Sequence, residues 1–336
     1  MTVKEQVLLI LEEQKNNPIS GQEIAQRLGC TRAGVWKAVK ALVDEGYQVE
    51  AVNNKGYTLK TSADVLSHVY IAKKVKEAGF DIEIECFETI DSTNSYVKRL
   101  AAEGHGRDCI AIAAQQTAGR GRRGRSFYSP NGTGVYISFL LHPEVSVAEA
   151  PMLTTMAATA EAFAIEQVTG FDTGIKWVND IFLREKKVSG ILTEASTSME
   201  DGSLEYVVVG VGFNLYEPKG GFPEEIKDIA GSIYPKDAQV ENLKNDMMAQ
   251  FIIKFLEYYR TFPDRSYLPD YEKRCFCIGK DVNIMTSEHS RLEQDGAGVD
   301  KSHAHVLGIN EDCHLHVRYD DGTEEYLNSG EISIRL

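Results

Sequence analysis

The sequence predicts an α+β protein with more than one domain, and three observations lead to that prediction. Apolar residues at helical spacing followed by a hairpin turn mark the first 60 residues, helices and strands mix in the middle, and short alternating strands follow Tyr271. The length of 336 residues exceeds the size at which a single hydrophobic core stops growing. We therefore expect an N-terminal helical unit, a central α/β unit and a C-terminal β unit.

The composition indicates a soluble globular protein of the cytoplasm. Hydrophobic residues make up 43% and charged residues 26% of the chain, and the mean hydropathy is −0.27. No apolar run approaches the ~18 residues of a membrane span, and acids interrupt the first 14 residues where a secretion signal needs an apolar segment. The six cysteines are scattered without zinc-site spacing, which favours reduced thiols. We expect a cytoplasmic protein with no membrane partner.

The first 60 residues match the pattern of a winged helix-turn-helix. Apolar spacing predicts a helix over residues 3–14, Ser20 begins a second helix with a capping box, and Thr31 caps a third that ends near Gly46. Two extended runs then flank NNKG at 53–56, which is a hairpin turn signal. Three helices and a hairpin in this order predict a winged helix-turn-helix domain at residues 1–62.

The third helix and the hairpin carry the candidate DNA contacts. In this motif the third helix enters the major groove, so its polar face and the wing supply the candidates: Arg32, Trp36, Lys37, Lys40 and Lys55. The chain has a net charge of −14, so a nucleic acid has to be met by this local patch. Residues 1–60 hold eight basic and seven acidic side chains. This small excess leaves open the alternative of a winged helix that binds protein.

An arginine- and glycine-rich loop marks the central region. GRGRRGR at 119–125 follows the strand-like run CIAIAA and leads into a second strand, GVYISFLL. The spacing of Gly119, Gly121 and Gly124 formally matches a dinucleotide fingerprint, but that fold needs a helix at these glycines. Arginine offers a planar fork of donors to phosphate or carboxylate, and glycine lets the backbone close over a ligand. The loop therefore predicts an anion-binding site between two strands.

Polar clusters at strand ends predict a pocket in the same unit. DSTN at 91–94 precedes a helix, KWVND at 176–180 lies in a strand over 174–183, Lys187 precedes a small-residue strand, and Asn214 ends a buried one. Singly, these are an ordinary helix cap, turn residues between two strands and a solvated lysine. Gathered along one mixed sheet, they predict a ligand pocket. Helices are expected over 65–78, capped within 61–64, and from Ala148 to about Val168.

Together these motifs resemble the family of bifunctional biotin-protein ligases that also serve as biotin operon repressors. The resemblance rests on VWKAVKALVDEGY and GYTL, then DSTN, QQTAGRGRRGR, SPNGTGVYIS, KWVND, KKVSGIL, VVVGVGFN and GEISIR, which follow the family order across nearly the whole chain. Val178 stands where the family often has proline, and Phe127 where tryptophan often follows the arginine loop. Both residues remain apolar, so we expect changes in loop stiffness and not in chemistry.

The resemblance implies an architecture and an activity. Residues 63–270 would share the catalytic fold of class II aminoacyl-tRNA synthetases, and residues 271–336 would form an SH3-like barrel. The protein would use ATP and Mg²⁺ to form biotinyl-5′-AMP and would transfer biotin to a lysine of a biotin carboxyl carrier domain. As a homodimer with biotinyl-5′-AMP as corepressor, it would also repress transcription at operator DNA of the biotin genes.

The resemblance also implies roles for individual residues. It places biotin on Ser92, Thr93, Asn94, Gln116, Arg120, Gly121, Arg122 and Lys187. It places the nucleotide on Arg120, Arg122, Asn179, Asn214 and Arg335. Catalysis would depend on Arg122, Lys187 and Asp180, and Asp180 would orient Mg²⁺ or help to deprotonate the acceptor lysine. Apart from Asp180, no side chain is expected to hold the metal of Mg-ATP.

Two features of the C-terminal region have no assigned role in this scheme. The polar segment 287–303 is expected to be an enlarged loop of the barrel. Three histidines at its end and beyond, His303, His305 and His316, form a possible metal set, but alternation on solvated strand faces explains them better.

Two other functions remain as alternatives. One is a DNA-binding biotin sensor whose central domain binds ligand without catalysis, and the other is a synthetase-like tRNA enzyme. The intact KWVND motif, Lys187 and the arginine loop favour the ligase over the sensor. The tRNA enzyme would need an anticodon-binding domain, and the sequence contains none of recognisable kind.

Overall fold

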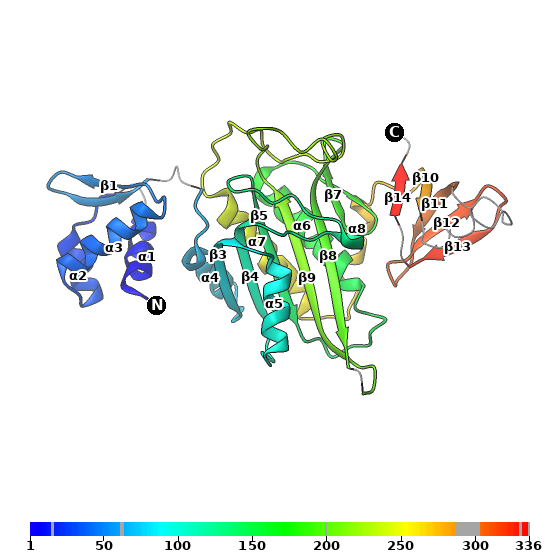
Figure 1. Cartoon of the computed structure of the whole chain (residues 1–336), viewed down its shortest axis with the longest axis horizontal. Helices are drawn as coiled ribbons and strands as arrows, with labels where there is room; N and C mark the ends of the chain where they lie inside the picture. The colour runs from blue at the N-terminus through cyan, green and yellow to red at the C-terminus, as the bar shows by residue number, and fades with distance from the viewer. Residues whose placement is uncertain (15–16, 61–63, 199, 286–302, 329–330, 335–336) are drawn as a thin grey trace.

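Figure 1 shows three units in a row in the computed structural model. The structure describes residues 1–336 except 15–16, 61–63, 199, 286–302, 329–330 and 335–336. Helices and a hairpin come first, a sheet covered by helices lies in the middle, and a smaller sheet follows. Among the described helices, none is both long enough and apolar enough to cross a membrane. The expected order of helical, α/β and β units is confirmed.

The N-terminal unit consists of three helices and a hairpin around its own core. The elements are α1 (Val3–Glu13), α2 (Gly21–Leu28), α3 (Arg32–Asp44), β1 (Val49–Val52) and β2 (Gly56–Leu59). Thr2, Ser20 and Thr31 begin the three helices, each accepting a backbone N–H with its side-chain oxygen. Apolar side chains of α1, α2, α3 and β2 form one cluster that contains no residue of the central unit. The predicted three helices and hairpin are confirmed.

The connection to the central unit differs from the expected helix over 65–78. The helix α4 (His68–Glu77) begins three residues later, and Ser67 is its N-cap. The expected cap, Asp64, instead accepts the backbone N–H of Lys244, and the Val65 carbonyl accepts a hydrogen bond from Asn245. Because the polar groups of residues 64–65 bind the start of α7 (Leu243–Tyr259), they are not part of a helix. The rest of the expected linker, 61–63, lies outside the described residues.

A mixed sheet of seven strands forms the centre of the molecule. Its order is β3-β4-β5-β9-β8-β7-β6, and only β3 and β4 run parallel. The strands are β3 (Glu83–Ile90), β4 (Cys109–Gln116), β5 (Gly134–Leu141), β6 (Gly174–Lys176), β7 (Asp180–Leu183), β8 (Lys186–Thr197) and β9 (Leu204–Asn214). All eight residues of β5 are buried, as expected for a strand covered on both faces. The arginine-rich loop joins β4 to β5, which confirms the predicted strand-loop-strand.

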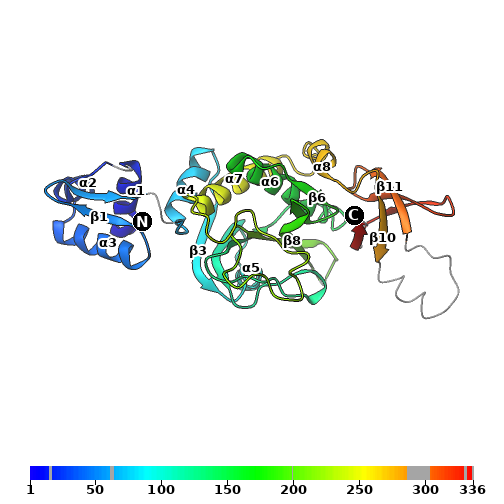
Figure 2. The ribbon, with the colours of Figure 1, turned by 90° about the horizontal axis from the view of Figure 1, so that it is seen from above.

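Helices cover the two faces of this sheet unequally. Figure 2 shows α4, α6 (Met152–Thr169), α7 and α8 (Leu268–Arg274) on one side and α5 (Thr93–Ala102) on the other. The helix expected from Ala148 begins only at Met152, because Pro151 disfavours a helical conformation in the residue before it. The helix α8 runs across the expected boundary between residues 270 and 271.

KWVND forms a hairpin and not the single strand expected over 174–183. The strands β6 and β7 pair with each other, and residues 177–179 form the turn between them. Trp177 is 3% exposed in this turn, and its Nε1–H donates to the carbonyl oxygen of Cys313 at 3.0 Å. The chain reverses its direction at Asn179, and the tryptophan of the motif is buried in the turn. The alternative of two strands joined by a turn is therefore the one that the structure adopts.

The C-terminal unit is an antiparallel sheet of five strands in the order β13-β12-β11-β10-β14. The strands are β10 (Asp281–Met285), β11 (His303–Ile309), β12 (Leu315–Tyr319), β13 (Glu324–Leu327) and β14 (Glu331–Ile334). Its buried side chains belong to the same apolar cluster as those of the central sheet. The segment 287–302 of the expected enlarged loop lies outside the described residues.

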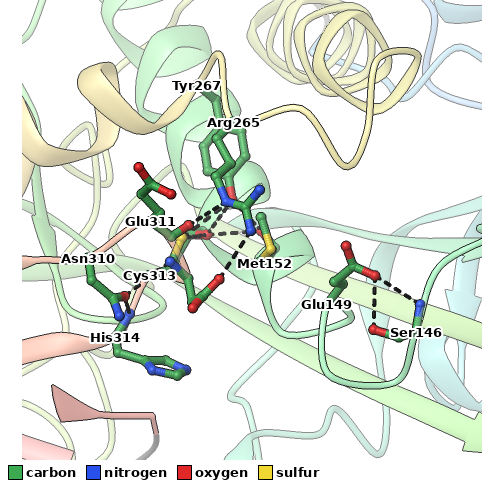
Figure 3. Close-up of polar contacts among 11 residues, drawn as sticks. Ser146, Glu149, Met152, Arg265, Tyr267, Asn310, Glu311, Cys313 and His314 are labelled. Carbon is green, nitrogen blue, oxygen red and sulfur yellow. Dashed lines mark hydrogen bonds and ion pairs between the residues drawn. The ribbon is translucent and has the colours of Figure 1, made fainter.

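A turn of the C-terminal unit docks onto the central helices. Figure 3 shows Arg265 and Tyr267 directed at the turn that contains Glu311 and Cys313. Arg265 Nε donates to the carbonyl oxygen of Glu311 at 2.7 Å, and the Thr155 hydroxyl donates to the Cys313 sulfur at 3.1 Å. Since the same turn binds Trp177, the C-terminal unit supports the KWVND hairpin.

The two tryptophans of the chain provide a test of this docking. Trp177→Phe removes the donor to the Cys313 carbonyl and leaves a buried acceptor unpaired, so we expect a loss of about 1–3 kcal/mol in stability. Thermal unfolding measures the loss as a lowered Tm. Trp36→Phe is the control, because Trp36 is 55% exposed. Equal Tm values for the two variants would contradict the role given to Trp177.

Candidate active site

A pocket lies where the first turn of α5 meets the strands β4, β8 and β9. Its lining residues are Ser92, Thr93, Asn94, Gln116, Arg120, Phe127, Gly190, Leu192, Gly210, Val211 and Gly212. The first five were predicted from the sequence, and they come from three separate segments. The structure therefore brings most of the predicted biotin set together.

Hydrogen bonds fix the polar wall of this pocket. Gln116 Oε1 accepts the backbone N–H of Thr93 at 2.8 Å, and Gln116 Nε2 donates to the Ser129 hydroxyl. Ser138 on β5 is fully buried, and its hydroxyl lies 2.7 Å from Thr93 Oγ1 and 2.6 Å from Asn94 Oδ1. Ser92 also caps α5, so the cap interpretation of DSTN and the pocket interpretation both hold. The polar side chains of the wall are held by hydrogen-bonding partners that are themselves fixed, so the wall is preorganised.

Glycines form the floor of the pocket. A Cβ at Gly210 would lie 1.9 Å from Asn94 Oδ1, and one at Gly212 would lie 2.5 Å from the Phe127 ring. Real Cβ atoms do not approach other atoms this closely, so any side chain at these positions would displace the wall or the ring. Glycine is therefore required on β9 for Asn94 and Phe127 to reach their places.

The arginine-rich loop folds back on itself beside the pocket. The backbone N–H of Gly121 donates to the Arg125 carbonyl at 2.7 Å, and that of Phe127 donates to the Gly119 carbonyl. Arg120 lines the pocket, whereas Arg122 reaches the hairpin, where its Nη1 donates to Asn179 Oδ1 at 2.7 Å. The loop thus connects the predicted biotin and nucleotide sets.

Lys187 and Asp180 form an ion pair at the edge of the pocket. Lys187 Nζ lies 2.5 Å from Asp180 Oδ1, and Asp180 pairs in register with Gly190 of the pocket floor. A Cβ at Gly190 would lie 3.0 Å from Lys187 Nζ. Both side chains are about three-quarters buried. The lysine is therefore not a solvated surface residue, and its ammonium faces the pocket strand.

The remaining predicted nucleotide residues lie outside the pocket wall. Asn214 Nδ2 donates to the Gly231 carbonyl, which holds the loop after β9. Asn179 is 7% exposed and binds Ile191 through its side-chain amide. Arg335 falls outside the described residues. The structure thus gives Asn214 and Asn179 loop contacts and does not locate Arg335.

The described residues do not form a magnesium site of their own. No group of three or more His, Cys, Asp or Glu side chains converges in that part of the chain. Asp180 is the expected candidate, but the Lys187 ammonium already occupies its Oδ1. Magnesium commonly binds one or two carboxylates together with substrate phosphates. One ion-paired carboxylate does not fit an independent magnesium site.

The three C-terminal histidines also do not converge on one point. His303 pairs with Asp320, His305 with Asp281, and His316 with Glu324. Each histidine has a separate acidic partner, on a strand of the C-terminal sheet for His305 and His316 and in the turn after β12 for His303.

The predicted DNA contacts lie in a different unit from the pocket. Arg32, Trp36, Lys37 and Lys40 are exposed on α3, and Lys55 is exposed in the turn between β1 and β2. Lys40 Nζ lies 5.8 Å from the centre of the Trp36 ring, a cation–π distance. The first helix of the unit contacts α4 of the central unit, with Glu13 paired to Lys73. The exposed α3 surface is thus available to a partner.

Several residues at the pocket were not identified as site residues from the sequence. Phe127 was noted only as a departure from the family, yet its ring covers the glycine floor. Ser138 and Glu194 were not named, although both bind Asn94. The alternation of Gly210 and Gly212 within VVVGVGFN was a usable signal, because two glycines on one face of a buried strand indicate a close approach.

A fully buried carboxyl lies near the Lys187–Asp180 pair. Glu161 on α6 is 0% exposed, and neither of its oxygens has a hydrogen-bond partner among the described residues. Burial raises the pKa of Glu161 to about 8, against smaller lowering effects of Ser189 and Lys187. At neutral pH this carboxyl is therefore mainly protonated.

The raised pKa of Glu161 predicts a pH-dependent stability. Between the ordinary pKa of 4.5 and about 8, the folded protein holds a proton that the unfolded chain has released, so stability falls as pH rises through this window. Glu161→Gln is neutral at every pH, and we expect its Tm advantage over the wild type to grow from pH 5 to pH 8. Glu205→Gln on the exposed end of β9 is the control. A constant Tm difference across this range would contradict the assignment.

Comparison with known proteins places all three units in one family. The model of the Biotin/lipoate A/B protein ligase family matches residues 86–214, an HTH domain model matches 3–58, and the Biotin protein ligase C terminal domain matches 298–335. A solved biotin protein ligase from Aquifex aeolicus, in complex with biotin and ATP, aligns with a TM-score of 0.58 at 25% identity. The alignment covers 75% of this chain and 98% of that one.

Curated relatives match almost end to end. The bifunctional ligase/repressor BirA of Bacillus subtilis (strain 168) is 33% identical over 314 residues, covering 92% of this chain and 95% of the relative. The bifunctional ligase/repressor BirA of Escherichia coli (strain K12) is 29% identical over 320 residues, covering 94% and 92%. Identity at this level over both lengths, together with the three matching domains, shows that the chain belongs to the bifunctional ligase/repressor family of biotin protein ligases.

Proposed function

We propose that the protein is an ATP-dependent biotin ligase that also represses transcription of biotin genes. The observation that carries the proposal is the pocket itself, in which Ser92, Thr93, Asn94, Gln116 and Arg120 converge beside the Lys187–Asp180 pair. A biotin sensor without catalysis would need only the binding wall. The buried ion pair and the Arg122–Asn179 contact add polar groups at the pocket edge that favour the enzyme.

The chemistry explains why cations surround the pocket. A carboxylate is a poor electrophile toward an amine, so its oxygen first attacks the α-phosphorus of ATP and pyrophosphate leaves. The amine of an acceptor lysine then attacks the carbonyl carbon of biotinyl-5′-AMP, an amide bond forms and AMP leaves. Both steps bring several anionic oxygens together, and preorganised cations stabilise the charge that develops. Arg120, Arg122 and Lys187 are the residues that supply them in this proposal.

Each part of the pocket matches one part of the ligand. Ser92, Thr93, Asn94 and Gln116 would hold the ureido ring, because hydroxyl and amide groups satisfy both its carbonyl oxygen and its N–H groups. Gly121, with Arg120 and Arg122, would close the loop over the biotin carboxyl and the phosphates. The Phe127 ring and the glycine floor supply the apolar surface for the rest of biotin.

The nucleotide would lie between the arginine loop and the KWVND hairpin. Arg120 and Arg122 would contact the phosphates, and Asn179 and Asn214 would border the nucleotide, with Arg335 reaching it from the last unit. Mg²⁺ would arrive with ATP, held mainly by phosphate oxygens. In this proposal Asp180 keeps Lys187 oriented, and it receives the proton of the acceptor lysine only after the ion pair opens.

The finer architecture and the partners belong to the same proposal. The central unit, residues 63–270, would share its fold with class II aminoacyl-tRNA synthetases, and residues 271–336 would form an SH3-like barrel. Residues 1–62 would bind operator DNA as a winged helix-turn-helix, supported by the exposed cations of α3 and the wing. Biotinyl-5′-AMP would act as corepressor by favouring a homodimer that reaches two half-sites.

One experiment tests the enzymatic part directly. The full-length protein is incubated with ATP, Mg²⁺, labelled biotin and a biotin carboxyl carrier domain, and the carrier is examined for label. We expect covalent label on one lysine of the carrier, with AMP and pyrophosphate released. Tight biotin binding without label on the carrier would favour the sensor.

Replacing Lys187 separates catalysis from stability. We expect Lys187→Ala to slow biotin-dependent pyrophosphate release roughly 100-fold, the scale on which one preorganised electrostatic group acts. The Tm should fall only moderately, because the Asp180 carboxylate loses its partner but keeps about a fifth of its side chain exposed to water. Lys227→Ala is the matched control, since Lys227 forms only an exposed ion pair with Glu224. If Lys187→Ala leaves the rate of pyrophosphate release unchanged, this lysine has a structural role and not a catalytic one.

Replacing two cations of α3 separates repression from ligation. The whole chain is acidic, so DNA binding depends on a few local phosphate contacts and should weaken strongly with salt. We expect Arg32→Ala combined with Lys40→Ala to abolish a gel shift of DNA from upstream of the biotin genes, while adenylation persists. Lys4→Ala is the control, because Lys4 pairs with Glu45. If the wild type gives no shift at moderate salt, with or without biotin and ATP, the domain binds protein instead.

A further inference from the structure

Glu194 lies beyond the lining of the pocket, where it contacts the pocket residue Asn94, and it has no role in the function proposed above. On β8, Gly190 and Leu192 line the pocket, and Glu194 follows on the same face because side chains alternate along a strand. On α5, Asn94 and Lys98 are one turn apart and share a face. The side chains of Asn94 and Lys98 both reach the Glu194 carboxyl from α5.

The Glu194 carboxyl has one partner on each oxygen. Asn94 Nδ2 donates to Oε2 at 2.9 Å, and the Lys98 ammonium pairs with Oε1. Burial alone would raise the pKa of Glu194, but the hydrogen bonds from Lys98 and Asn94 outweigh burial and hold it below its ordinary value. The group is therefore a carboxylate at neutral pH, and a carboxylate only accepts hydrogen bonds.

This carboxylate determines which way the Asn94 amide points. Since Glu194 accepts only, the NH₂ group of Asn94 has to face it, and the carbonyl Oδ1 has to face Ser138. The single proton of the buried Ser138 hydroxyl then goes to Asn94 Oδ1 at 2.6 Å. The Thr93 hydroxyl then has two oxygens that can accept its single proton, Ser138 Oγ at 2.7 Å and Gln116 Oε1 at 3.1 Å. The hydrogen bonds donated by Ser138 and by Asn94 thus both run toward the carboxylate.

We propose that Glu194 is a positioning residue for biotin, which fixes the hydrogen-bond direction of Asn94 and Ser138 through its contact with the Asn94 amide. The inference rests on the proposed function in taking biotin as the ligand. With its proton given to Ser138 or to Gln116, Thr93 Oγ1 meets the ligand only as an acceptor, and the oxygen of Asn94 keeps a fixed place. A ureido ring presents N–H donors, so the directed chain selects it over groups that only accept.

The test is a double-mutant cycle on biotin affinity, measured by calorimetry on the full-length protein. Glu194→Gln allows the Asn94 amide to reverse, and we expect the Kd for biotin to rise about tenfold, or ~1.4 kcal/mol. Asn94→Asp places two carboxylates together and should raise the Kd further. In the double variant, the new amide at position 194 donates to one oxygen of the new carboxylate at position 94, and Ser138 donates to the other, so the direction is restored. We expect its Kd to return to within a few-fold of wild type.

Two controls distinguish the effect of hydrogen-bond direction from the effect of a lost ion pair and from that of a surface substitution. Lys98→Ala removes the ion pair but keeps the carboxylate and its bond to Asn94, and we expect less than a twofold change in Kd. Glu205→Gln is a matched substitution on the exposed end of the neighbouring strand, and it should change nothing. The Kd for ATP and the Tm should stay at wild-type values in Glu194→Gln.

The outcomes distinguish this inference from the proposed function. If the effects of Glu194→Gln and Asn94→Asp multiply in the double variant, or if Lys98→Ala is as harmful as Glu194→Gln, the inference is wrong while biotin binding by the wild type stands. If the wild type binds no biotin, both the inference and the proposed function are overturned.

Discussion

The contact between Asn94 and the glycine backbone of β9 is the constraint on which the site depends. Asn94 Oδ1 occupies the space in which a Cβ of residue 210 would lie, at 1.9 Å, so the first turn of α5 rests directly on the sheet. This close approach brings DSTN to Ser138, Gln116 and Glu194, which come from three different strands. Without it, Ser92 to Asn94 would be an ordinary helix cap, and the pocket would have no polar wall.

The supports of the site extend beyond the central sheet. The KWVND hairpin holds Asp180 against Lys187 and Asn179 against Arg122, and its buried Trp177 is bound by the turn of the C-terminal unit. On the other side, the residues after the helix-turn-helix unit bind the start of α7 through Asp64. The edge of the pocket is therefore supported by the C-terminal unit, and the arginine-rich loop lies beside the pocket.

Much of this arrangement could be predicted from sequence, and the failures have physical causes. Caps and apolar spacing predicted the three N-terminal helices, because those signals are local. The late start of α4 and the hairpin of KWVND could not be predicted from the neighbouring sequence. Lys244, Asn245 and Cys313 form hydrogen bonds with those segments, and all three lie far away in the chain. Glu194 was missed for the same reason, because its partners lie on a helix 96 and 100 residues away.

The most direct test of this account is the biotin affinity of Gly210→Ala. The added methyl group would displace the Asn94 side chain, so we predict at least a roughly tenfold rise in the Kd for biotin, with secondary structure retained by circular dichroism. Gly220→Ala is the matched control, since a Cβ there meets no atom within 4 Å among the described residues, and it should bind biotin as the wild type does. A wild-type Kd for biotin in Gly210→Ala would contradict the central claim that the Asn94 contact with β9 builds the pocket.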